Sequence, residues 1–197
     1  MTEPDPAVAP APRLRAVVLV EGESDRAAVE ALAGRQGRDL AAEGVAVLAM
    51  GGAGNVGRFL ARYGPRGLDV RLAGLVDAGE EPDLRRALAL AGLGDGRLDR
   101  EGLAALGFHV CEADLEDELI RALGVAAVER VVAAQGELRA FRTLQKQAAQ
   151  RGRTPEAQLR RFLGSGSGRK VRYGRLLVEA LDPARVPAPL AAVLAHV

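Results

Sequence analysis

The apolar run Ala16–Val20 (AVVLV) and the acidic stretch that follows it, Glu21–Asp25 (EGESD), decide the fold class. Five successive apolar residues are typical of a strand that is buried on both faces of a parallel sheet. The polar residues mark the end of that strand, and Ser24 is expected to cap a helix that continues to about Gly34. This strand, turn and helix make up the unit from which parallel α/β sheets are built.

Three further apolar runs repeat this pattern along the chain. They are Val45–Met50 (VAVLAM), Arg71–Val76 (RLAGLV) and Phe108–Cys111 (FHVC). Helical patterns follow them at Asn55–Tyr63, from Pro82 and from Asp114. Because strands alternate with helices, we expect an α/β fold with a parallel sheet of about four strands and helices on both faces.

The length of 197 residues suits one domain with an extension. Residues 1–12 are rich in proline and lack periodicity, which predicts a disordered arm. After Leu115 no strand pattern recurs, and the remaining chain reads as helices interrupted by a GSGSG segment. The expected organisation is an arm at 1–12, an α/β core at 13–123, and a basic helical extension at 124–197 that completes the same domain.

The net charge of +1 conceals two halves of opposite sign. Residues 1–120 carry 13 basic and 21 acidic groups, whereas residues 121–197 carry 14 basic and 5 acidic groups. Such asymmetry indicates a polyanionic partner for the basic half.

The chain has no apolar run of membrane-spanning length, no signal peptide pattern and one cysteine, so a cytoplasmic location is expected. Only 3% of the residues are aromatic and none is tryptophan, which argues against base stacking as the main mode of binding.

Carboxylates follow three of the four expected strands. They occur in Glu21–Asp25, in Asp77–Glu81 and in Glu112–Glu118. Because the carboxyl ends of parallel strands meet at one edge of the sheet, these acids are expected to lie together. Mutual repulsion favours a hard divalent cation, Mg²⁺ or Mn²⁺, and the sequence offers no cysteine–histidine cluster for zinc. The acids near helix starts have an alternative role, which is to stabilise the helix N-terminus.

Four segments, taken in order, resemble a known family. Val20–Asp25 after an apolar strand resembles the first motif of the Toprim domain, which topoisomerases, bacterial primases and several nucleases share. Asp77 matches the first aspartate of the D-x-D motif of that domain. Ala113–Leu119 (ADLEDEL) resembles a stretch of the OLD-family (overcoming lysogenization defect) nucleases, and Lys170 in GRKVRY matches their downstream lysine. The resemblance extends over about residues 14–182.

The resemblance implies a Toprim, Rossmann-like fold and metal-dependent hydrolysis of nucleic-acid phosphodiesters by an endonuclease. It implies one or two Mg²⁺ or Mn²⁺ ions, in line with two-metal phosphodiester chemistry. The metal ligands it implies are Glu21, Asp25, Asp77, Asp114 and Glu116, with Glu80 as a further candidate. Glu21 would also act as general acid or base, and Lys170 would stabilise charge on the phosphate.

The resemblance also implies partners. DNA, or alternatively RNA, would be held along its backbone by arginines of the extension, namely Arg142, Arg160, Arg161, Arg169 and Arg172. The chain contains no phosphate-binding loop of the kind found in the ATPase portion of OLD proteins, so we expect a stand-alone Toprim protein, with or without a separate ATPase partner. A homo-oligomer is left open. Turn glycines at Gly22, Gly52 and Gly54 would allow close approach to the site.

Two departures from the family pattern keep other functions open. Gly79 stands where the D-x-D motif has its second aspartate, which favours as an alternative a non-catalytic Toprim module that binds DNA or a partner protein. Gly52–Gly57 also reads G-x-G-x-x-G, with Asp77 twenty residues further on. That pattern favours a dinucleotide-binding oxidoreductase. We rank this reading lowest because the glycines follow the second strand, whereas the fingerprint follows the first.

Overall fold

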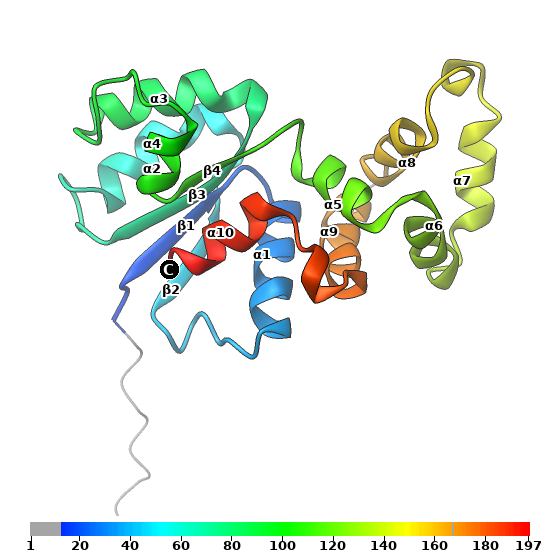
Figure 1. Ribbon diagram of the computed structural model, residues 1–197, viewed down its shortest axis with the longest axis horizontal. Coiled ribbons are helices and arrows are strands. Elements are labelled where there is room, and N and C mark those ends of the chain that lie inside the picture. The colour runs from blue at the N-terminus through cyan, green and yellow to red at the C-terminus, as the bar shows by residue number, and fades with distance from the viewer. Residues whose placement is uncertain (1–12, 167) are drawn as a thin grey trace, which may run out of the picture.

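The computed structural model describes residues 13–166 and 168–197, and the expected arm at 1–12 lies outside these residues. Four strands form one parallel sheet in the order β2-β1-β3-β4 (Figure 1). They are β1 (Ala16–Val20), β2 (Val45–Ala49), β3 (Arg71–Asp77) and β4 (Phe108–Cys111). Helices cover both faces of the sheet, so the expected α/β class is confirmed.

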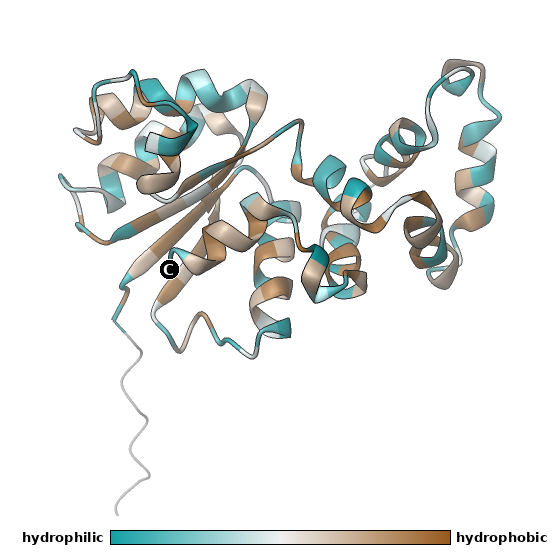
Figure 2. Ribbon diagram, in the orientation of Figure 1, coloured by the Kyte–Doolittle hydropathy of each residue, from teal (hydrophilic) through white to brown (hydrophobic). Residues whose placement is uncertain are grey.

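Alternate residues of β1 enter two different cores. Val18 and Val20 pack in the cluster that includes α1 (Glu23–Arg35) and the C-terminal helices. Val17 and Leu19 pack in the cluster beneath α2 (Val56–Tyr63), α3 (Glu81–Leu90) and α4 (Arg100–Ala105). The strands are accordingly apolar along most of their length (Figure 2). Two buried faces explain why the sequence of β1 is a continuous apolar run and does not alternate.

The register aligns the carboxyl ends of the strands. Val20 at the end of β1 pairs with Ala49 of β2 and with Leu75 of β3, and Asp77 pairs with Cys111 of β4. The third strand is one residue longer than the apolar pattern predicts, because Asp77 is its last residue. The segments that follow β1, β3 and β4 therefore start from one edge of the sheet.

The remaining helices follow the fourth strand. They are α5 (Leu115–Leu123), α6 (Val125–Ala134), α7 (Leu138–Gln145), α8 (Pro155–Leu163), α9 (Arg169–Ala180) and α10 (Ala188–Ala195). Short 3-10 turns complete the fold at η1 (Ala53–Asn55), η2 (Ala78–Glu80), η3 (Ala148–Gln150) and η4 (Pro183–Arg185). Of the helices that the structure describes, none combines the length and the apolar content that crossing a membrane requires.

The cap expected at Ser24 is wrong. Helix α1 begins at Glu23 with Gly22 as its N-cap, and the Gly22 N–H donates to Oδ2 of Asp25 at 2.9 Å. Asp25 therefore supplies the side chain that closes the start of this helix. Ser24 is 4% exposed and lies beneath α9, where its carbonyl oxygen faces Gly174.

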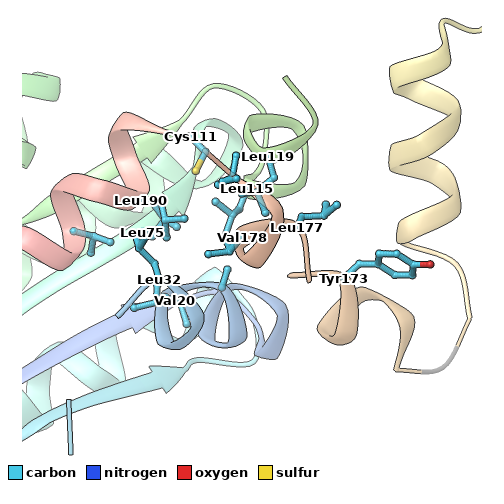
Figure 3. Packing of buried hydrophobic residues seen from close by; sticks show 14 of the residues in the cluster. Val20, Leu32, Leu75, Cys111, Leu115, Leu119, Tyr173, Leu177, Val178 and Leu190 are labelled. Atoms are coloured by element: carbon cyan, nitrogen blue, oxygen red, sulfur yellow. The ribbon is translucent and has the colours of Figure 1, made fainter. Parts of the chain in front are cut away.

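The helical extension returns to the α/β core through α9 and α10. Leu177 and Val178 of α9 belong to the same buried cluster as Leu32 of α1 (Figure 3). Arg35 of α1 donates to the carbonyl oxygens of Val178 at 2.6 Å and of Leu181 at 2.8 Å. Helix α10 then packs on β3 and β4, on the same face of the sheet as α1 (Figure 1). These contacts fix the position of α9 relative to the edge where the acids lie.

The close contact between α1 and α9 predicts a sensitive position at Gly174. A Cβ atom there would lie 2.5 Å from the carbonyl oxygen of Ser24, which belongs to backbone that cannot move without shifting α1. We expect Gly174→Ala to lower the free energy of unfolding by about 2 kcal/mol and the midpoint of thermal unfolding by about 4–8 °C. Gly34→Ala in α1 is the control, because nothing lies within 4 Å of its Cβ position. Equal stability of both variants would contradict this packing.

Candidate metal and phosphate site

Five carboxylates gather at the carboxyl edge of the sheet. Glu21 follows β1, Asp25 lies in the first turn of α1, Asp77 ends β3, and Asp114 and Glu116 begin α5. Burial raises the pKa of Asp77 to about 7, and the negative charges of the other four carboxylates add to that shift. Each of the other four carboxylates therefore lies close enough to Asp77 to repel its charge.

Two of these carboxylates are almost completely buried. Asp25 is 8% exposed and Glu116 is 6% exposed. Burial raises the pKa of both side chains; the Gly22 N–H opposes the shift at Asp25, and the charge of Lys170 opposes it at both. A buried carboxylate that accepts few hydrogen bonds is costly unless a cation lies beside it. The cluster is thus built to hold positive charge.

In this structure the positive charge comes from two side chains of the extension. The Lys170 Nζ atom of α9 lies 3.3 Å from Oε1 of Glu116. The Arg160 Nε atom of α8 donates to Oδ2 of Asp114 at 2.7 Å, while Oδ1 of Asp114 accepts from the backbone N–H of Asp117 at 2.8 Å. Burial opposes the charge of Lys170, but the attraction of Glu116 and Asp25 outweighs it and raises the lysine pKa.

A cleft runs beside these two ion pairs, between α5 and the helices α8 and α9. Its volume is about 530 Å³, and Asp114, Glu116, Arg160 and Lys170 line it. Arg161 lines the same cleft and is exposed; within residues 13–166 and 168–197 it forms no ion pair. The cleft therefore connects the carboxylate cluster with the exposed guanidinium group of Arg161. Carboxylates for a metal ion and a cation for a phosphate group are what a phosphate bound beside a metal ion needs.

The other arginines expected on the DNA backbone are engaged with acids. Arg142 forms an ion pair with Glu129 at 2.6 Å, and both Arg169 and Arg172 pair with Glu137. Four of the five predicted backbone arginines thus contact carboxylates, and Arg160 does so inside the cluster itself. The fifth is Arg161.

Of the acids that follow Asp77 at the end of β3, one is ion-paired and one is not within the part of the chain that the structure describes. Glu81 forms ion pairs with Arg85 and Arg100, so its carboxylate already has two cationic partners. Glu80 is half-buried in the turn η2 after Asp77, and no ion pair involves it among the residues that the structure describes. Gly79, which replaces the second aspartate of the D-x-D motif, has nothing within 4 Å of its Cβ position. Glu80 is accordingly the acid of this segment that is available as a further ligand.

Glu137 accepts hydrogen bonds from side chains at the start of α9. We predict that these bonds make the stability of the protein depend on pH. Its Oε2 atom accepts from the buried hydroxyl of Tyr173 at 2.7 Å and from Arg172 at 2.6 Å. Burial opposes its charge, but the hydrogen bonds from Arg169, Tyr173 and Arg172 outweigh it and lower the pKa to about 2. Because the folded-state pKa is depressed, this stabilisation is present above about pH 4.5 and is lost as the pH falls toward 2.

We expect Glu137→Gln to lower the free energy of unfolding by about 2 kcal/mol at pH 7. In thermal unfolding this corresponds to a midpoint about 4–8 °C below that of the wild type. The difference should narrow as the pH is lowered below 4.5. A difference that stays constant down to pH 3 would show that the charge of Glu137 does not matter. Glu179→Gln, on the exposed side of α9, is the control.

The glycine loop after β2 supports the strand end that carries Glu21. The N–H groups of Gly51 and Gly52 donate to the carbonyl oxygen of Glu21 at 3.0 and 3.1 Å, and Gly52 has φ 114°, which favours glycine. Gly54 lies in the turn η1. These two amides are therefore occupied and do not point at a phosphate, as the dinucleotide-binding reading would require.

Asn55 is a site residue that the sequence reasoning missed. Its Nδ2 atom donates to the carbonyl oxygens of Met50 at 2.9 Å and of Gly51 at 3.3 Å, so it closes the same loop. The signal in the sequence is an asparagine that follows a glycine-rich turn directly before a helix.

The donor set suits a hard divalent cation. All five side chains at the edge offer carboxylate oxygens, which are the ligands that Mg²⁺ and Mn²⁺ prefer. The neighbouring Cys111 is fully buried, and burial raises the pKa of its thiol, so it stays protonated and is a poor ligand. Within the described part of the chain, no three acidic, histidine or cysteine side chains are already arranged around one point as metal ligands.

A parallel sheet with acids at its carboxyl edge, completed by a returning helical segment, is the architecture of a Toprim-type protein. The family model of the overcoming lysogenization defect protein-like Toprim domain matches residues 14–78. The stretch 14–78 is therefore similar to the OLD-like Toprim domain that the motifs indicated. No curated protein sequence matches the chain significantly.

Solved structures extend the likeness to the rest of the chain. The C-terminal region of the Xanthomonas campestris pv. campestris OLD protein is 25% identical, with a TM-score of 0.69 over 92% of this chain and 91% of that one. The C-terminal region of the Burkholderia pseudomallei OLD protein is 19% identical, with a TM-score of 0.68 over 92% and 96%. The fold of this chain is therefore that of OLD C-terminal regions, helical extension included.

Proposed function

We propose that this protein is a metal-dependent endonuclease that hydrolyses phosphodiester bonds of DNA. The observation that carries the proposal is the contact of two extension cations, Arg160 and Lys170, with carboxylates at the edge of the Toprim sheet. Carboxylates that hold a divalent cation beside cationic groups that bind phosphate form the arrangement that phosphodiester hydrolysis requires. The likeness to OLD proteins supports the same reading.

Each side chain has a role in this proposal. Glu21, Asp25, Asp77, Asp114 and Glu116 hold Mg²⁺ or Mn²⁺, with Glu80 as a further ligand. When bound, the cation supplies Lewis-acid stabilisation of the phosphodiester. Glu21, which the loop at Gly51 and Gly52 fixes by its backbone, accepts the proton of the attacking water. Lys170 and Arg160, which contact Glu116 and Asp114 in this structure, would stabilise the negative charge of the phosphate.

Several further assignments belong to the same proposal. Residues 13–123 and 124–197 form one domain, because α9 packs on α1 and α10 packs on the sheet. Arg161 holds the DNA backbone from the cleft, and Arg142, Arg169 and Arg172 contribute their charge from their ion pairs. The protein acts in the cytoplasm and is served by an ATPase, as the matched regions belong to longer OLD proteins.

The direct experiment is a nicking assay on supercoiled plasmid with Mg²⁺, Mn²⁺, Ca²⁺ or EDTA. We expect nicked and linear products with Mn²⁺ or Mg²⁺ and none with EDTA. Glu21→Gln should abolish the products, because it removes both a ligand and the proton acceptor. Unchanged plasmid under all conditions, from folded wild-type protein, would refute catalysis. Cleavage that survives Glu21→Gln would refute the assignment of the site.

A second candidate function is DNA or partner binding without cleavage. Gly79 in place of an aspartate and the absence of preset ligand triads among the described residues favour it. Its signature in the same experiments is a steeply salt-dependent affinity for DNA with intact plasmid.

A further inference from the structure

The exposed face of α2 carries positive charge and aromatic rings that the carboxylate site does not use. Arg58 and Arg62 are exposed on successive turns of the helix, and Phe59 and Tyr63 are half-buried beside them. The rings of Phe59 and Tyr63 stack with centroids 6.4 Å apart and planes 25° apart. The four side chains line a hollow of about 360 Å³.

The charge of this face has no internal counterpart. Residues 44–68 contain three arginines and no acid, although they belong to the acidic half of the chain. Elsewhere in that half, several helix arginines pair with a nearby acid, among them Arg26 with Glu30 and Arg85 with Glu81. Within the described residues neither Arg58 nor Arg62 is in an ion pair. The carbon atoms Cζ of these arginines lie 5.4 and 5.2 Å from the ring centroids of Phe59 and Tyr63.

We propose that this face, which we call the α2 face (Arg58, Phe59, Arg62 and Tyr63), binds single-stranded nucleic acid. Guanidinium groups at one-turn spacing fit backbone phosphates, and an aromatic ring beside each of them offers a surface on which a base stacks. A duplex offers phosphates but keeps its bases paired, so the rings select single strands. A strongly anionic ligand with exposed ring systems is the partner that complements both features.

The position of α2 relates the face to the carboxylate cluster. The loop that precedes α2 donates two hydrogen bonds to Glu21, so the helix starts at the edge of the sheet where the acids lie. In Figure 1, α2 lies with α3 and α4 on one face of the sheet, whereas α8 and α9 lie beyond the edge. A strand that binds the α2 face and the cleft at Arg161 would pass the carboxylates between them. The proposal shares its ligand class with the proposed nuclease but does not require cleavage.

The test is the affinity of the protein for a fluorescein-labelled oligothymidylate, measured by fluorescence anisotropy in EDTA so that no cleavage occurs. The double variant Arg58→Gln/Arg62→Gln should weaken binding at least tenfold and reduce the salt dependence by about 1.4 in log–log slope, about 0.7 for each lost phosphate contact. Phe59→Leu keeps the apolar packing and removes the ring, and it should weaken the single-strand affinity by more than fivefold. Its effect on duplex affinity should be less than twofold.

The matched control is Arg86→Gln/Arg97→Gln, which removes the same charge from exposed positions outside α2. Circular dichroism and thermal unfolding verify that each variant is folded. Wild-type affinity in the α2 double variant would overturn the proposal, as would equal losses in the α2 and control variants. No binding of the wild type to oligothymidylate would overturn it too. Loss of cleavage in the nicking assay leaves this result unaffected, so the two proposals fail separately.

Discussion

Replacing Asp77 by asparagine is expected to stabilise the metal-free protein and to remove its metal-dependent cleavage. Both effects arise from the negative charge of Asp77, which burial disfavours and which the repulsion from four neighbouring carboxylates disfavours further. In the absence of a cation that repulsion destabilises the folded state, and in its presence the same charge binds the ion. We expect cleavage to fall by a factor on the order of 10²–10³, as when one charge-stabilising group is removed from an active site.

The stability effect depends on pH with a defined sign. The pKa of Asp77 is raised from 3.8 to about 7, so its contribution to stability is fully present below about pH 4 and is lost as the pH rises to 7. The Asp77→Asn variant does not ionise at this position, so its stability does not fall in this pH range for that reason. Because Asp77 is only half-buried, solvent screening limits the gain to about 1–2 kcal/mol, or about 2–8 °C in the unfolding midpoint.

Thermal unfolding in EDTA between pH 4 and pH 8 measures this difference. The advantage of Asp77→Asn should grow up to about pH 7 and then level off. Asp83→Asn on the exposed side of α3 is the control and should give neither the gain nor the loss of cleavage, because Asp83 pairs with Arg86 and lies outside the cluster. An asparagine variant that is less stable than the wild type at pH 8 would contradict the electrostatic account.

Replacing Lys170 by methionine is expected to separate cleavage from metal binding. Its ammonium group lies 3.3 Å from Glu116 and carries the charge that we assign to the phosphate. Cleavage should fall about 10²-fold, in the range for loss of one group that stabilises developing charge. The affinity for Mn²⁺ should stay the same or rise, because the lysine competes with the ion for Glu116.

The second lysine of the chain provides the matched control. Lys146 follows α7, is exposed and forms no ion pair within the described ranges 13–166 and 168–197, so Lys146→Met should cleave like the wild type. Isothermal titration with Mn²⁺ and the nicking assay are run on both variants. Weaker Mn²⁺ binding by Lys170→Met would show that the lysine organises the metal site, against its assignment to the phosphate.

The fold and the strand ends could be predicted because they depend on local pattern. A strand buried on both faces must be a continuous apolar run, so Ala16–Val20 and the acids after it identified the sheet and its edge. The approach of Asp77 to Glu21 follows from parallel pairing and needs no side-chain detail. The N-cap of α1 at Gly22 was not predicted, because Ser24 is a preferred capping residue, whereas the helix starts one residue before Ser24 and the side chain of Asp25 accepts a hydrogen bond from the Gly22 N–H.

Contacts between distant segments were beyond the reach of the sequence. Arg160 and Asp114 are 46 residues apart, and only the packing of α8 on α5 brings them together. The basic stretch indicated an anionic partner, but its local charge count could not show that Glu129 and Glu137 already hold several of its arginines. A low aromatic content likewise concealed that Phe59 and Tyr63 share one exposed face.

The most direct test of the carboxylate site is anomalous scattering from crystals of this protein soaked in Mn²⁺. Our account predicts one or two manganese peaks at the carboxyl edge of the sheet, coordinated by Asp77 together with Glu21 or Asp114. It also predicts that the Arg160 and Lys170 side chains move away from their carboxylates, and that the peaks disappear in Asp77→Asn. A saturating soak that leaves this edge without manganese, with both ion pairs intact, would contradict it.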